Sequence, residues 1–119
     1  MLPDVFIKQL HDIGLNPETY LQCAKVLAKK SGYPTDKIDF SLDDDHKLCI
    51  VSPSGKVIRF GKAQYNDYIL WTWLEINKEV PEGTAHDKRR LYHARAENIK
   101  GDWEDNPYSP NNLAIHIIW

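Results

Sequence analysis

The chain has 119 residues, 42% of them hydrophobic and 27% charged, with a net charge of −2. This size fits one domain, which we expect to span residues 1–119, and it allows about two-thirds of the unfolded chain's surface to be buried. The near-neutral charge excludes a general attraction to nucleic acid or to an anionic membrane, and no apolar run approaches the roughly 20 residues of a membrane span.

The first thirty residues carry the pattern of a helical hairpin. Apolar side chains recur at helical spacing over residues 3–13, and Gly14 is a natural stop. Asn16 then supplies an N-cap and Pro17 a first turn for a second helix that runs to about residue 31. A helix-turn-helix is the alternative, but the second helix offers little beyond Gln22 to read base edges. We favour a plain hairpin.

Residues 37–60 change to a period of two, which is typical of strands. Turn residues at Asp43–Asp45 and Ser52–Gly55 separate three runs, so we expect a three-stranded antiparallel meander. The three runs are Ile38–Leu42, Leu48–Val51 and Lys56–Phe60. The acidic turn lies beside His46, which suggests a metal site, but three consecutive carboxylates in a tight turn diverge. We interpret them as a solvated turn.

The second half returns to helical patterns. We expect helices over residues 63–76 and 86–99, with a loop over residues 78–84 between them. Ser109 and a following proline start a last element, a short helix or a strand, that reaches Trp119. The expected fold class is therefore α+β: an N-terminal helical hairpin, a three-stranded antiparallel meander and C-terminal helices packed on the sheet.

No sequence motif for catalysis, metal binding or a cofactor is present. Cys23 and Cys49 are isolated, so we interpret them as buried apolar residues rather than ligands or a redox pair. The chain lacks a glycine-rich phosphate loop and a serine-hydrolase motif. We expect no cofactor and no metal, and an enzyme only if distant residues such as Arg59 and Asp67 converge with a histidine in a cleft.

Tryptophan and arginine gather in the second half of the chain. All four residues of each kind lie in residues 56–119. On a helix, Trp71 and Trp73 would point about 200° apart, so either one faces out or each belongs to a separate cluster. Exposed tryptophan and arginine are typical interface anchors. We expect the contacts with a partner to come from Arg59, Tyr65, Trp71, Arg89, Arg90, Trp103 and Trp119.

The helix over residues 86–100 is the most basic element, with four Lys or Arg residues between positions 88 and 95. Arginine forks suit phosphate, so nucleic-acid binding by this helix is one hypothesis. A structural helix with salt bridges is the other, and we favour it. In that case Arg95 would be buried and paired with an acid such as Asp67.

Three short motifs carry a family resemblance. They are Arg59-Phe60-Gly61 followed by Tyr65-Asn66-Asp67-Tyr68, then Arg89, Tyr92 and Arg95 spaced by three, then Asn111–Ala114 leading to Ile118-Trp119. This pattern resembles a small uncharacterised family from eukaryotic large DNA viruses and polinton-like viruses, whose members carry R-F-G, Y-x-D-Y, R-x-x-Y-x-x-R and a final L-W. The likeness covers residues 30–119.

The resemblance implies a context rather than an activity. It implies a viral protein, located in the virion or in the interior of the infected host cell, where it would act as a minor capsid, cement or virion-core protein. Lys8 and nearby acids interrupt the N-terminal apolar pattern, so we expect no signal peptide. The leading hypothesis is a non-enzymatic interaction protein that binds other proteins such as capsid subunits, with nucleic acid as the alternative partner.

Overall fold

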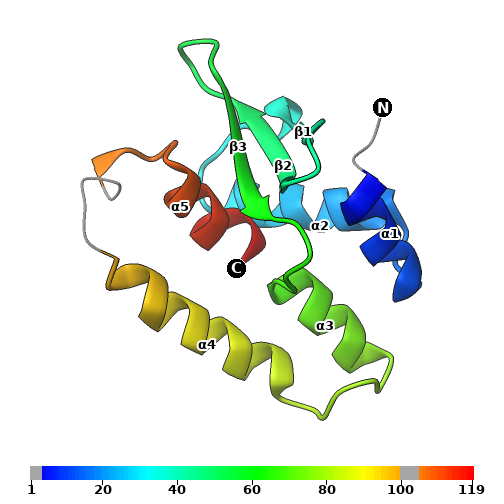
Figure 1. Cartoon of the computed structure of the whole chain (residues 1–119). Helices are drawn as coiled ribbons and strands as arrows, with labels where there is room; N and C mark the ends of the chain where they lie inside the picture. The colour runs from blue at the N-terminus through cyan, green and yellow to red at the C-terminus, as the bar shows by residue number, and fades with distance from the viewer. Residues whose placement is uncertain (1–3, 100–104) are drawn as a thin grey trace.

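A computed structural model of the chain describes residues 4–99 and 105–119. Helices precede and follow a three-stranded sheet along the chain, which confirms the expected α+β class (Figure 1). In chain order the elements are α1 (Asp4–Asp12), α2 (Pro17–Lys30), η1 (Thr35–Lys37), β1 (Ile38–Phe40), β2 (His46–Val51), β3 (Val57–Lys62), α3 (Tyr68–Ile76), α4 (Thr84–Glu97), α5 (Pro110–Leu113) and η3 (Ala114–Ile118).

The N-terminal helices form the predicted hairpin. The Asn16 side chain accepts a hydrogen bond from the Glu18 amide at 2.8 Å, and Pro17 occupies the first turn of α2. Both features satisfy or remove backbone donors that the first turn of a helix leaves without partners. Phe6 of α1 and Tyr20 of α2 are fully buried and meet edge to face, with ring centroids 4.9 Å apart. The hairpin therefore contributes directly to the hydrophobic core.

The sheet is the predicted antiparallel meander, in the order β1-β2-β3. Leu48 in the central strand pairs with Phe40 on one side and Phe60 on the other, and all three side chains are buried. The first strand is shorter than predicted. The Ser41 hydroxyl donates a hydrogen bond to the Asp43 carboxylate, so the turn begins directly after Phe40 and leaves Leu42 74% exposed.

The helix predicted from residue 63 starts later, at Tyr68. The Asp67 carboxylate caps α3 by accepting a hydrogen bond from the Leu70 amide at 2.9 Å. Before it, Gln64 has a positive φ of 78°, which a right-handed helix does not allow. Residues 63–66 therefore form a loop rather than a first helical turn.

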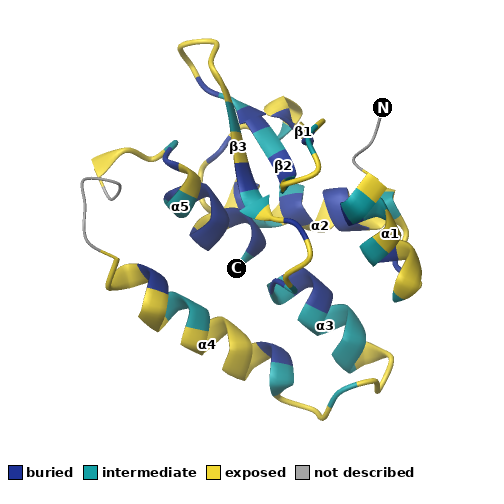
Figure 2. Cartoon of the chain, viewed as in Figure 1, coloured by how far each residue is buried: buried dark blue, intermediate teal, exposed yellow. Residues whose placement is uncertain are grey.

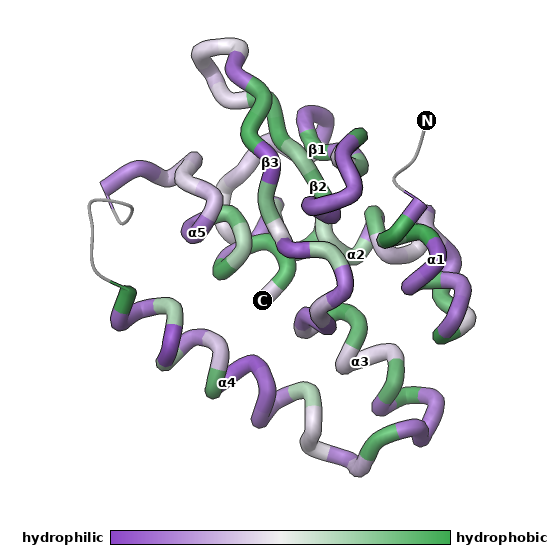
Figure 3. Tube along the Cα trace, viewed as in Figure 1, coloured by the Kyte–Doolittle hydropathy of each residue, from purple (hydrophilic) through white to green (hydrophobic). Residues whose placement is uncertain are grey.

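The C-terminal helices occupy two different positions. α5 and the π-helical turn η3 form one short helix, capped by the Ser109 side chain, that contacts β3 and α2. α4 packs against α3 instead and is mostly exposed, with Ala85 and Ala96 as its buried residues (Figure 2). The residues of α4 are hydrophilic over much of the helix (Figure 3). Among the described helices, none combines the length and apolar character needed to cross a membrane.

Candidate functional site

A cleft of about 980 Å³ lies between α4 and the rest of the molecule. We call it the α4 cleft. Its walls come from the start of β2, the end of β3 and the loop that follows, α3, α4, α5 and η3. The aromatic side chains that line it are the buried Phe60 and the more exposed Tyr65, Trp71, Tyr92 and Trp119. The most exposed cations are Lys62, Lys88 and Arg95. Acidic side chains are scarce, since Asp45 alone represents them among the described lining residues.

α4 presents one face to this cleft. Lys88, Leu91, Tyr92 and Arg95 line it and follow one another at spacings of three, one and three residues. Residues so spaced lie on the same side of a helix. The cleft-facing side of α4 therefore combines two cations, an aromatic ring and an exposed leucine.

Each of the three cations lies over an aromatic ring. The Lys62 Nζ is 5.7 Å from the centre of the Tyr65 ring, the Lys88 Nζ is 5.0 Å from that of Trp71, and the Arg95 guanidinium is 5.7 Å from that of Tyr92. These are cation–π distances. Within residues 4–99 and 105–119, no carboxylate forms an ion pair with any of the three. The aromatic rings therefore hold these three cations in position, and no carboxylate of the described residues neutralises their charge.

The rings of Tyr92 and Trp119 stack across the cleft wall, with centroids 4.2 Å apart and planes within 4° of parallel. This contact joins α4 to the C-terminal helix. Burial raises the pKa of Tyr92 above its ordinary value of 10.0, although the neighbouring Arg95 charge opposes that effect. The Tyr92 ring is half-buried, which is the cause of this shift.

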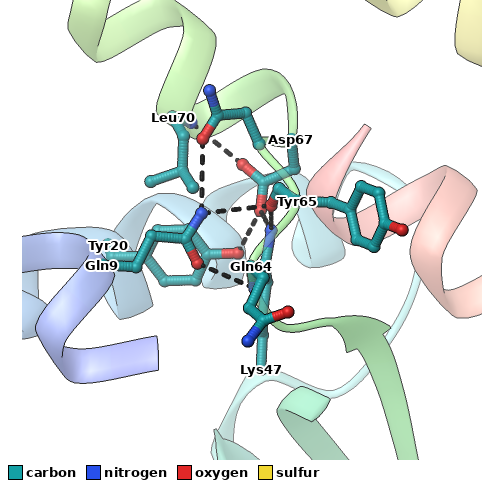
Figure 4. A network of polar contacts seen from close by, with 8 residues as sticks. Gln9, Tyr20, Lys47, Gln64, Tyr65, Asp67 and Leu70 are labelled. Carbon is teal, nitrogen blue, oxygen red and sulfur yellow. Dashed lines mark hydrogen bonds and ion pairs between the residues drawn. The ribbon is translucent and has the colours of Figure 1, made fainter. Parts of the chain in front are cut away.

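A buried polar network holds the loop that carries Tyr65 and Asn66. Figure 4 shows the Lys47 and Tyr20 side chains converging on the Asp67 carboxylate. The Lys47 Nζ lies 2.9 Å from Asp67 Oδ2, and the Tyr20 hydroxyl donates a hydrogen bond of 2.5 Å to the same oxygen. All three side chains are almost fully buried. Burial, followed by the Asp67 charge, raises the pKa of Tyr20 well above 10.0.

The same network fixes the backbone of Tyr65. Its carbonyl oxygen accepts hydrogen bonds from the Lys47 ammonium group and, at 3.3 Å, from the Gln9 side-chain amide. The Gln9 side-chain oxygen in turn accepts a hydrogen bond from the Gln64 amide at 3.2 Å. The Tyr65 side chain itself remains 63% exposed and lines the cleft. A rigid, buried support thus presents an exposed aromatic ring.

The structure brings together three of the seven predicted contact residues. Tyr65, Trp71 and Trp119 all line the α4 cleft. Arg89 is exposed and lies 4.7 Å from the centre of the Tyr68 ring, outside the cleft lining. Arg59 lies on β3 beside Asp43, with Nε 3.8 Å from a carboxylate oxygen. Arg90 is also exposed and does not line the cleft, and Trp103 lies outside the described residues.

Two expectations about side chains were wrong. Arg95 is exposed, and the buried partner of Asp67 is Lys47, because Lys47 on β2 reaches that carboxylate from inside the molecule. Cys23 is exposed on α2 rather than buried, since it lies beside the apolar stripe of the helix and not within it.

The two tryptophans of α3 belong to separate clusters, as one of the two alternatives predicted. The Trp73 indole donates a hydrogen bond of 2.8 Å to the Ile13 carbonyl and packs against the main core. Trp71 instead lines the α4 cleft.

The acidic turn after β1 forms a local hydrogen-bonded group. Asp43 accepts hydrogen bonds from Ser41 and from His46 Nδ1, the latter at 2.7 Å. Burial would raise the pKa of Asp43, but these two partners outweigh it and hold the pKa below 3.8.

Arg59 and Asp67 were named as residues that could converge with a histidine in a cleft. They have different partners instead, because Asp67 lies in the buried network and Arg59 lies beside Asp43. Among the described residues, no three His, Cys, Asp or Glu side chains are grouped so that they could hold a metal ion.

Five residues that shape the cleft were not among the predicted contact residues, namely Lys62, Lys88, Tyr92, Arg95 and Asn111. Lys88 and Arg95 belong to the predicted basic helix, whereas Tyr92 and Asn111 entered only through the motifs of the family resemblance. The spacing of Lys88, Tyr92 and Arg95 places them on one helical face. The direction of that face, and the positions of Lys62 and Asn111, depend on how the elements pack.

Comparison of this chain with protein-family models, with curated proteins and with solved structures finds no match. The resemblance to the viral family therefore stays a prediction.

Proposed function

We propose that this chain is a non-enzymatic interaction protein whose contact surface is the α4 cleft. The observation that carries the proposal is the pairing of three cations with three aromatic rings along one cleft, without neutralising acids in the described part of the chain. Aromatic and arginine side chains are the residues that most often anchor a partner in an interface.

The buried polar network beside the cleft favours a binding role over a catalytic one. The buried Lys47–Asp67 pair is used to hold the loop before α3, and its side chains are only 2% and 1% exposed. These two charges are therefore unable to reach a substrate. Rings and cations are prominent among the side chains that do reach solvent in the cleft, and such groups recognise a partner by stacking and by charge.

Site-specific photocrosslinking in the source cells tests the proposal. The photoreactive residue p-benzoylphenylalanine would replace Leu91, which lines the cleft and is 53% exposed. The matched control carries the same residue in place of Leu42, which is 74% exposed in the turn between β1 and β2. Both sites are exposed leucines, so the two proteins differ only in where the probe lies.

We expect specific covalent adducts at position 91 and only background at position 42. Treating the adducts with nuclease gives the class of the partner, because only an adduct with nucleic acid is shortened by it. Equal labelling of both positions, or none at position 91, would show that the α4 cleft is not the contact surface.

We also propose that the protein is a viral structural component, a minor capsid, cement or virion-core protein. This proposal rests on the motif resemblance described above. Mass spectrometry of purified particles from the source tests it. A fixed copy number relative to the major capsid subunit would support the proposal, whereas a protein abundant in infected cells and absent from particles would refute it.

A further inference from the structure

We infer that the partner bound in the α4 cleft is a single-stranded nucleic acid. This inference rests on the proposed function and names the partner of the same surface. It takes up the nucleic-acid hypothesis for the basic helix and assigns the contact to the side of α4 that faces the cleft, where Lys88 and Arg95 lie.

The cations are spread along the cleft rather than gathered at one point. Lys88 and Arg95 are seven residues apart on α4, which separates their Cα atoms by about 10 Å along the helix axis. Lys62 comes from β3, in another wall of the cleft. A single phosphate group would need converging donors, whereas a chain of phosphates fits charges at intervals. The spacing therefore favours a polyanion over a mononucleotide.

The rings distinguish a nucleic acid from an acidic peptide. An acidic peptide would satisfy the three charges but has no general use for exposed aromatic surface beside them. Bases stack on such rings, and arginine adds a cation–π contribution. Tyr65, at 63% exposure on a rigid loop, offers most of its ring to a ligand. In a duplex the faces of the bases are already covered by their neighbours, so stacking on protein rings requires an unpaired strand.

A fluorescence anisotropy titration tests the inference. The intact protein would be added to a 15-nucleotide fluorescein-labelled oligothymidine at 25 mM salt and at increasing salt concentrations. Three phosphate contacts predict that log K falls against log salt concentration with a slope of about −2, since each contact to a single strand contributes about −0.7. A labelled hairpin duplex is titrated for comparison. Unlabelled polyglutamate is added to the single-strand complex as a competitor.

Three variants of α4 provide the comparison. Lys88→Gln and Arg95→Gln each remove a cleft cation, and we expect each to weaken binding several-fold and to reduce the salt slope by about 0.7. Arg90→Gln is the matched control, because Arg90 lies on the same helix, is exposed and does not line the cleft. It should bind within twofold of wild type. Circular dichroism checks that all three are folded, as expected for exposed side chains.

Several results would overturn the inference: no binding of the oligonucleotide at 25 mM salt, equal affinity for the duplex, competition by polyglutamate at equal charge, or Arg90→Gln as damaging as Arg95→Gln. Crosslinked adducts at position 91 that nuclease leaves unchanged would also refute it. In that last case the α4 cleft would still be the contact surface, so the two proposals fail separately.

Discussion

Tyr92 and Trp119 stack almost parallel, with ring centroids 4.2 Å apart, and this contact ties the exposed helix α4 to the C-terminal helix. α4 otherwise packs against α3, which precedes it in the chain. The α4 cleft lies between these attachments and the sheet. The Tyr92–Trp119 stack is therefore one of the contacts that set the shape of the cleft.

Replacing Tyr92 with alanine should release α4 without unfolding the core. An aromatic pair contributes about 0.5–1.5 kcal/mol beyond the area it buries, so we expect a loss of about 1–2 kcal/mol for this half-buried ring. Hydrogen exchange followed by mass spectrometry should show faster exchange of α4 amides with β2 and β3 unchanged. Tyr92→Phe keeps the ring and should exchange like wild type. Uniformly faster exchange throughout the protein would contradict this role for the stack.

The buried pair of Lys47 and Asp67 should be sensitive to the loss of either partner. Lys47→Met leaves the Asp67 charge buried with only neutral partners, and breaking such a pair typically costs about 3–5 kcal/mol. Urea unfolding measures the loss. The double variant Lys47→Met with Asp67→Asn should lose less than the sum of the two single variants, because no charge is then left unpaired.

A surface pair provides the control for this prediction. Lys8 and Asp12 lie 3.3 Å apart on α1, but their side chains are 77% and 64% exposed. Exposed pairs contribute little, so Lys8→Met should change the free energy of unfolding by at most about 0.5 kcal/mol. Similar losses for Lys8→Met and Lys47→Met would mean that the burial of the Lys47 pair has no energetic importance.

Local patterns in the sequence were sufficient to predict the helical hairpin and the meander. Asn16 and Pro17 mark the start of α2 by their own chemistry, and the strands follow from alternation and turn residues. The start of α3 could not be predicted in the same way. Residues 63–66 look compatible with a helix, but Lys47 on β2 binds the Tyr65 carbonyl, and this tertiary contact excludes the first helical turn.

The candidate site was predictable only in part. Tyr65, Trp71 and Trp119 stood out by residue type, and the structure places them in one cleft. Nothing local in the sequence shows that the Lys88 and Arg95 face of α4 turns towards the body, since that orientation depends on Tyr92 meeting Trp119. Residue type indicates which side chains suit an interface, whereas long-range packing decides which of them meet.

The Tyr20 hydroxyl should make stability depend on alkaline pH. Burial, followed by the Asp67 charge, raises its pKa in the folded protein well above 10.0. Above about pH 10 the unfolded chain therefore loses this proton while the folded protein keeps it, so stability falls as pH rises. The contribution is fully present below pH 10. Urea unfolding between pH 8 and pH 11 should show a shallower decline for Tyr20→Phe than for wild type, and parallel curves would refute this assignment.

Gly61 should be the least replaceable glycine among those with positive φ in the described residues. Its φ is +76°, and a Cβ added there would lie 2.8 Å from Ile118 Cδ1 and 3.5 Å from Lys47 Cβ. Gly61→Ala therefore combines backbone strain of about 1–2 kcal/mol with overpacking of about 1–3 kcal/mol. The Ile118 side chain would have to shift at the edge of the α4 cleft.

Gly55→Ala is the matched variant, because it shares the backbone strain without the clash. Gly55 has a φ of +84° in the turn between β2 and β3, and nothing lies within 4 Å of an added Cβ. We expect it to lose only the backbone component of about 1–2 kcal/mol in urea unfolding. The difference between the two variants measures how tightly the C-terminal helix closes on β3. Equal losses would mean that Ile118 moves aside freely and that this packing does not hold the wall of the cleft.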